Sequence, residues 1–313
     1  MQSITQRRQI VGYSLAALSA IIWGTEAVLV KLCYSSGFAV DSLLSLRYAV
    51  SLPMFALLVK MRGEPLLPPR DTLQPLLLLS ANVLVGVVML YIALALLPAA
   101  LAILFFYAYP SFTSLLHILL KRGPLGTPRL LALVISALGL ILLYWSSAEG
   151  LSFWGVACAL LAAALQSSKL FQTAHLLPCI SAGRLNLFNA FTTTVGASLF
   201  YLLHSAFSAN GLGLRAISTA GWVYMLILGM LVTVFATLFM TLGIRYVGAV
   251  DTSLAMLLEP LTTATLAFLI FGDTLGLWQT AGGLLVLLAV ALPALAGLKQ
   301  LKPPSEQLHA AQR

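Results

Sequence analysis

Charge is scarce in this chain of 313 residues: only 8% of the residues are charged, 60% are hydrophobic, and the mean hydropathy is +1.00. Soluble domains are roughly one quarter charged, so this shortage excludes an ordinary soluble protein. The composition instead indicates an integral membrane protein, whose surroundings are the lipid bilayer.

Motifs for catalysis, metal binding and nucleotide binding are also lacking. The cysteines and histidines have no ligand spacing: Cys33, Cys158, Cys179, His117, His175, His204 and His309. No disulfide or metal site is expected from them. Without a Walker motif, ATP cannot drive this chain directly, and nothing implies an ATPase subunit. We expect no enzyme activity and no cofactor, and a non-transporting membrane enzyme or sensor is the least favoured class.

Long apolar runs are abundant instead. A membrane-spanning helix needs ~20 mostly apolar residues, and about ten runs approach that length. They are centred in residues 10–31, 42–60, 72–92, 95–120, 128–146, 151–170, 183–205, 218–243, 248–271 and 277–297. Barrel strands would alternate apolar and polar residues, so the runs predict an all-α membrane protein of about ten transmembrane helices.

The placement of Lys and Arg predicts the orientation, because these residues resist translocation. With a cytoplasmic N-terminus, the inside loops and tails receive fourteen of them: Arg7, Arg8, Lys60, Arg62, Arg70, Lys121, Arg122, Arg129, Lys169, Arg184, Arg245, Lys299, Lys302 and Arg313. The outside receives Lys31 and Arg215, and Arg47 stays within a span. We therefore expect an inner (plasma) membrane protein with cytoplasmic tails at residues 1–9 and 298–313.

Two further features agree with this topology. The tryptophans expected at the outer helix ends, where indoles prefer the headgroup layer, are Trp145, Trp154, Trp222 and Trp278. The net charge of +8 is then a consequence of topology. It does not indicate nucleic-acid binding, which would need a basic face on a soluble loop or domain.

The chain is internally repeated. Pro110 and Pro260 lie 150 residues apart, and a gapless alignment at this offset also matches Thr113 with Thr263. The halves, residues 10–146 and 151–297, hold about five spans each, an odd number, so they would cross the membrane in opposite senses. Such inverted repeats can exchange conformations and open a midplane site first to one side and then to the other.

Several motifs resemble those of the EamA-type permeases of the drug/metabolite transporter superfamily. They are Trp23-Gly24 with Lys31, Arg47, Leu258-Glu259-Pro260 and Phe271-Gly272-Asp273. The resemblance covers roughly residues 10–297 as two tandem units. It implies ten helices, a central cavity between the halves, and export of amino acids, related metabolites or small toxic compounds.

The chain also departs from the family pattern. Its first repeat closes with Leu120-Lys121-Arg122 in place of a Leu-Gly-Glu-like ending, and Glu26 replaces a small or amide residue. The spacing from Glu26 to Lys31 is reminiscent of the small multidrug transporters, which use a carboxylate in their first helix.

Three ionisable residues fall within predicted spans: Glu26, Arg47 and Glu259. A charge there costs at least ~2.5–3.5 kcal/mol, so a partner is expected. At ~1.5 Å per residue, Glu26 and Arg47 lie at a similar depth, ~8–9 Å below the outer surface, and could pair. The pair is either structural or part of a substrate or proton site.

Pro110 and Pro260 each remove a helical N–H and free the carbonyl four residues earlier, that of Phe106 or Met256. We expect bends at both prolines, which would serve as hinges beside a cavity or as simple packing bends. Tyr109 and Glu259 precede them at equivalent positions, and both are candidate site residues.

Weaker candidates are uncharged. Thr233, Thr237 and Thr241 share one helix face, and back-bonding of their hydroxyls to the preceding turn is the simpler explanation. The intramembrane amides and the aromatic residue considered for the site are Asn82, Gln166, Asn189 and Trp23.

Three function classes follow. The first is an exporter of amino acids or similar metabolites, with proton coupling as a hypothesis that rests on Glu26 and secondarily on Glu259. The second is a multidrug or toxic-cation extruder, with Glu26 as the attracting charge. The third is the sensor class described above.

Overall fold

The computed structural model describes residues 2–109, 111, 112, 116, 127–145, 151–207, 217–256 and 258–300, and within these ranges it contains helices and no strand. Five segments of the described chain are long and apolar enough to cross a membrane: Gln9–Ser35, Val40–Met61, Arg70–Leu96, Phe153–Leu176 and Thr219–Val247. Shorter apolar helices cover Leu258–Phe271 and Leu277–Ala289. The chain is therefore a multi-pass, all-helical membrane protein.

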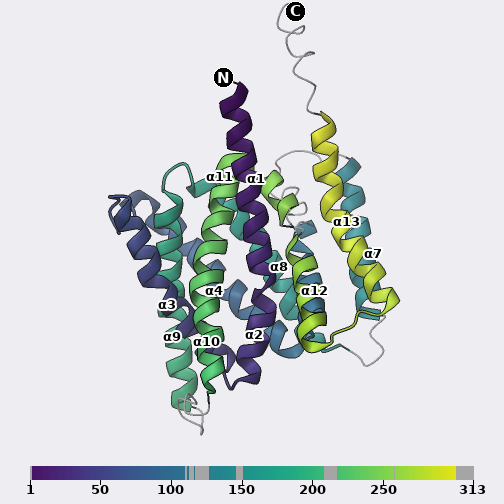
Figure 1. Ribbon diagram of the computed structural model, residues 1–313, viewed down its shortest axis with the longest axis horizontal. Helices are drawn as coiled ribbons and strands as arrows, with labels where there is room; N and C mark the ends of the chain where they lie inside the picture. Colours follow the sequence, from purple (N-terminus) through teal and green to yellow (C-terminus); the bar gives the residue numbers. More distant parts are fainter. Residues whose placement is uncertain are drawn as a thin grey trace, which may run out of the picture.

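The helices stand roughly parallel in a bundle (Figure 1). The first half provides α1 (Gln2–Gly24), α2 (Glu26–Ser35), α3 (Val40–Met61), the short 3₁₀ turn η1 (Arg70–Thr72), α4 (Leu73–Leu96), α5 (Ala99–Phe106) and α7 (Thr127–Trp145). The second half provides α8 (Phe153–Leu176), α9 (Ala182–Phe207), α10 (Thr219–Ile227), the π-helix η3 (Leu228–Ala236), α11 (Thr237–Ala255), α12 (Leu258–Phe271) and α13 (Leu277–Gln300).

The principal helix contacts join the two halves of the chain. Helix α1 packs along α11, α3 along α9, α4 along α8, and α7 along α13, while α5 packs against α12. Figure 1 shows two of these pairs clearly, α1 with α11 and α7 with α13. The halves thus interleave, and residues of both halves form the largest hydrophobic core cluster.

The first predicted span is not continuous. A turn at Thr25 separates α1 from α2, and the Thr25 hydroxyl donates to the carbonyl of Ile22 at 2.7 Å. The carbonyl of Gly24 instead accepts a hydrogen bond from Thr263 Oγ1 of α12 at 2.9 Å. The interruption places Glu26 at the first residue of α2.

The predicted boundary between the eighth and ninth spans is wrong. Residues 244–247 contain no Gly or Pro, and α11 continues through them to Ala255. The break comes just before α12, whose third residue is Pro260. The N–H groups in the first turn of a helix have no acceptor within that helix, so a proline is tolerated there. The chain therefore has a break between two helices where a bend within one helix was expected.

Lys169 was wrongly placed in a cytoplasmic loop. Residues 170–176 contain no Gly or Pro, so α8 continues to Leu176, shortly before Pro178. Lys169 therefore lies inside a candidate membrane span. The four tryptophans do lie at helix ends: Trp145 ends α7, and Trp154, Trp222 and Trp278 lie in the first turns of α8, α10 and α13. Pro110, the other expected hinge, lies outside the described residues.

Gly24 allows α1 and α12 to approach closely. A Cβ atom at this position would lie 2.4 Å from Thr262 Cβ and 2.9 Å from the carbonyl oxygen of Glu259. We predict that Gly24→Ala lowers the stability of the purified protein by about 1–3 kcal/mol, the usual cost of overpacking. Thermal unfolding in detergent measures the effect.

The matched control is Gly276→Ala, because a Cβ there would meet only Gln279 Oε1 at 3.8 Å. Equal melting temperatures for the two variants would contradict the close approach at Gly24.

Candidate functional site

A cavity of about 90 Å³ lies between the two halves. Six of the eight residues predicted for a substrate or proton site line it: Trp23, Glu26, Arg47, Tyr109, Gln166 and Glu259. The other two line neighbouring cavities, Asn189 one of about 50 Å³ and Asn82 one of about 40 Å³. Among the residues that the structure describes, no three His, Cys, Asp or Glu side chains gather as metal ligands would.

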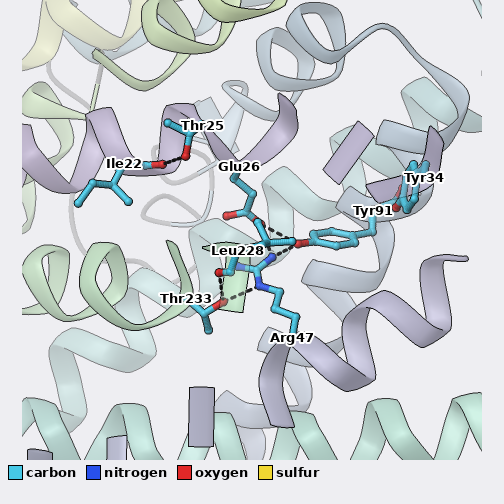
Figure 2. Close-up of polar contacts among 8 residues, drawn as sticks. All are labelled: Ile22, Thr25, Glu26, Tyr34, Arg47, Tyr91, Leu228 and Thr233. Atoms are coloured by element: carbon cyan, nitrogen blue, oxygen red, sulfur yellow. Dashed lines mark hydrogen bonds and ion pairs between the residues drawn. The ribbon is translucent and has the colours of Figure 1, made fainter. Parts of the chain in front are cut away.

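Glu26 and Arg47 form an ion pair, as their depths in the sequence predicted. Arg47 Nη1 lies 2.5 Å from Glu26 Oε1, and the two side chains are 4% and 15% exposed. Figure 2 shows the Arg47 side chain of α3 reaching up to the carboxylate at the start of α2. The pair offsets the large cost of a guanidinium charge within the bundle.

Two further partners complete the surroundings of Arg47. Its Nη1 also donates to the Tyr91 hydroxyl of α4, which lies 3.2 Å from Glu26 Oε1, and its Nε donates to Thr233 Oγ1 at 2.6 Å (Figure 2). The guanidinium stacks near the Tyr48 and Tyr91 rings, at 5.2 and 5.3 Å. We call Glu26, Arg47, Tyr91 and Thr233 the arginine cluster.

The π-helix η3 makes the Thr233 contact possible. Thr233 Oγ1 donates to the carbonyl of Leu228, five residues earlier, at 3.0 Å. Gly229 lets α3 approach, since a Cβ there would lie 2.9 Å from the Arg47 carbonyl oxygen. The back-bonding expected for the threonines is confirmed for Thr241, which donates to Thr237 at 2.8 Å. Thr233 differs because it also accepts from Arg47.

Glu259 lies in a second polar cluster at the restart of the broken helix. The Tyr107 hydroxyl, just after α5, donates to the carbonyl of Met256 and lies 3.1 Å from Glu259 Oε2. Pro260 was expected to free the Met256 carbonyl, but this oxygen also accepts a hydrogen bond from the Glu259 N–H at 3.0 Å, so Tyr107 adds a second donor from the other half of the chain. Glu259 is 8% exposed and Tyr107 is fully buried.

Lys169 is the site residue that the sequence reasoning missed. It lines all three cavities, and its Nζ lies 5.5 Å from the centre of the Trp23 ring. Lys169 was assigned to the cytoplasmic end of the span at residues 151–170, so its place within an apolar helix was not recognised. The signal available was the absence of Gly and Pro from residues 170–176, which left nothing to end the helix there.

The intramembrane amides make interhelical contacts. Asn82 Nδ2 donates to the Leu165 carbonyl at 3.0 Å, and Asn189 Oδ1 accepts from Ser80 Oγ at 2.7 Å. Asn82 Oδ1 is buried without a hydrogen-bond partner among the described residues. Asn189 and the donor side of Asn82 therefore join helices, and Asn82 also lines a cavity together with Gln166 and Lys169.

A cavity formed between two interleaved halves, lined by charges of both signs beside a broken helix, defines a polytopic membrane protein with a central site. The model of the EamA-like transporter family matches residues 10–145 and again residues 153–294. The chain belongs to this family.

Known structures support the fold. Twenty-seven chains of solved structures match. One, described only as a crystal structure of a protein, has a TM-score of 0.66 and 17% sequence identity, with 95% of this chain and 99% of that chain covered. At that identity the likeness shows the fold alone. No curated protein matches the chain.

We predict that the two charges of the arginine cluster are coupled in stability. Removing one partner leaves an uncompensated buried charge and costs about 3–5 kcal/mol, whereas removing both costs less. Arg47→Gln should therefore unfold at a lower temperature than the double variant Glu26→Gln/Arg47→Gln.

Thermal unfolding of both single variants and the double variant gives the coupling directly. Lys60→Gln, at an exposed lysine near the end of α3, controls for a general effect of losing a cation. Losses that simply add would mean that the pair does not stabilise the bundle.

Proposed function

We propose that this protein is a secondary transporter that exports amino acids or related small metabolites across the inner (plasma) membrane, in exchange for protons. The proposal assigns it ten spans in two inverted five-helix halves, residues 10–146 and 151–297, with both termini cytoplasmic. The solute binds in the central cavity, which opens alternately to either side.

One observation carries the proposal. The cavity is lined by helices of both halves and holds Glu26, Arg47, Lys169 and Glu259. Ionisable side chains within a membrane are costly and mark substrate or proton pathways when they face a cavity. A group with both charge signs suits a solute that itself carries both, as an amino acid does.

Among the carboxylates, Glu259 suits the proton site better than Glu26. The Glu26 carboxylate is held by Arg47 at 2.5 Å and by Tyr91 at 3.2 Å, and a proton there would break the ion pair. The recorded hydrogen-bond partner of the Glu259 side chain is the Tyr107 hydroxyl. The other ionisable groups that act on Glu259 are Glu26 and Lys169, with Tyr109 also nearby.

The number of protons that the Tyr107 hydroxyl can donate supports a protonated Glu259 in this conformation. A tyrosine hydroxyl has a single proton to donate, and the Met256 carbonyl can only accept it. The Glu259 oxygen, 3.1 Å from the same hydroxyl, makes a second good hydrogen bond only if the carboxyl group carries a proton and donates. An ionised Glu259 would compete with Met256 for the one tyrosine proton.

The exchange step follows from this arrangement. A solute ammonium group that approaches Glu259 favours the ionised carboxylate and displaces the proton. The Tyr107 contacts, which join the first half to the start of α12, then weaken. Movement at the break between α11 and α12 lets the halves change their relative position, and Pro260 at its edge acts as a hinge, with Pro110 in the equivalent place.

A second candidate is a multidrug or toxic-cation extruder. Aromatic side chains of Trp23, Tyr48, Phe106 and Tyr109 line the cavity, and aromatic faces attract organic cations. The pairing of Glu26 with Arg47 weighs against it, because the charge expected to attract the cation is already neutralised.

We predict saturable counterflow of L-alanine, L-leucine or L-phenylalanine in liposomes that contain the purified protein, with faster solute exit when the exterior is acidic. Glu259→Gln should remove the dependence on the pH gradient. Glu26→Gln should retain that dependence at a lower rate, because it disturbs the arginine cluster.

Movement of a cationic dye without amino-acid exchange would favour the extruder. Rates that do not respond to pH in the wild-type protein would contradict proton exchange. Tyr107→Phe removes the hydroxyl that contacts Met256 and Glu259 and so tests the contact at the break between α11 and α12. Tyr246→Phe, at an exposed site, is its matched control.

A further inference from the structure

Lys169 lines three cavities of the bundle. The central cavity has Lys169 among its lining residues, as do the one that Thr173 and Asn186 line and the one that Asn82 lines. A solute in any of these cavities therefore lies near the Lys169 side chain.

Among the described residues, Lys169 makes no direct ion pair with a carboxylate. The ion pair recorded in the described part of the chain is Glu26 with Arg47, and the recorded neighbour of Lys169 Nζ is the Trp23 ring at 5.5 Å. Glu26 is committed to Arg47 and Glu259 to Tyr107. A cation inside a membrane span without an ion partner is costly, and an anionic ligand would remove that cost.

We propose that Lys169 binds the carboxylate of the transported solute, with the Trp23 ring covering one side of the ammonium group. This inference rests on the proposed function, because it supposes that a small metabolite enters the cavity. It narrows the related metabolites to those that carry a carboxylate, and solutes in which that group is esterified or amidated bind more weakly.

The charges of the cavity agree with such a ligand. Glu26 and Arg47 cancel one another, which leaves Lys169 and Glu259 as the two groups that meet the solute. When Glu259 carries a proton, Lys169 gives the cavity one net positive charge. A zwitterion can place its carboxylate on Lys169 and its ammonium group on Glu259. Of these two contacts, only the one with Glu259 displaces a proton.

The amide groups near Lys169 can complete the site. Gln166 lies one helical turn before Lys169 on α8, and both line the central cavity and the one beside Asn82. Residues three apart on a helix are neighbours on its surface. The Gln166 amide can therefore donate to the second oxygen of a carboxylate held by Lys169.

Paired probes test the proposal without any variant. L-Alanine, L-leucine and L-phenylalanine are each compared with the corresponding amino-acid amide, which keeps the ammonium group and nearly the same size. Binding is read as thermal stabilisation of the purified protein, and transport as inhibition of counterflow. We expect each amide to bind about tenfold more weakly or worse, the effect of losing a charge-assisted hydrogen bond.

Substitutions then locate the effect. Lys169→Gln should bind acid and amide equally, Lys169→Arg should keep much of the preference because it keeps the charge, and Lys60→Gln should behave as the wild type. Wild-type protein that binds the amides as well as the acids, or a Lys169→Gln variant that keeps the preference, would overturn the proposal.

The two readouts separate this inference from the proposed function. Preferential binding of the acids without any counterflow would support the carboxylate site and contradict transport. Counterflow that ignores the carboxylate would support transport and overturn the site. If the protein shows no binding and no counterflow, both the carboxylate site and the proposed transport are overturned.

Discussion

The buried charge of Arg47 is the constraint on which the centre of this protein depends. An arginine whose side chain is only 4% exposed in a membrane protein is stable only if other groups accept the hydrogen bonds of its guanidinium. Those groups come from three other elements: Glu26 from α2, Tyr91 from α4 and Thr233 from η3. Meeting that requirement joins the first half to the second and sets the position of all four segments.

The local irregularities of the bundle follow from the same constraint. The turn at Thr25 starts α2 at Glu26, and the π-helix with Gly229 brings Thr233 to the guanidinium. π-Bulges are frequent at functional sites, and here one serves an ion cluster. The Tyr107 and Glu259 contacts are different in kind, because they depend on a single shared proton. A fixed cluster thus lies beside one that protonation can change, as the proposed exchange of solute for protons requires.

The sequence predicted the parts of the fold that depend on composition and spacing. Apolar runs gave the helices, and the family motifs gave the EamA membership that the two matches confirm. Depth along the helices paired Glu26 with Arg47, and Pro260 indicated an interruption of the helix close to its own position. These predictions succeeded because each depends only on residue type and on position along one or two helices.

The errors arose where tertiary contacts decide. Nothing near Tyr91 or Tyr107 in the sequence marks either as a partner of a charge 44 or 152 residues away. The length of α8 placed Lys169 inside the bundle, and the continuation of α11 moved a break from residues 244–247 to the start of α12. Helix ends are the least certain feature of sequence reasoning, and here they decided which cation faces the cavity.

The most direct test of the account is the number of protons released when solute binds. Purified protein in weakly buffered detergent solution is mixed with saturating L-alanine near neutral pH, and the pH change is recorded. We predict that about one proton leaves Glu259 for each solute bound, with no release from Glu259→Gln. Binding of L-alanine without proton release, or the same release from Glu259→Gln, would contradict it.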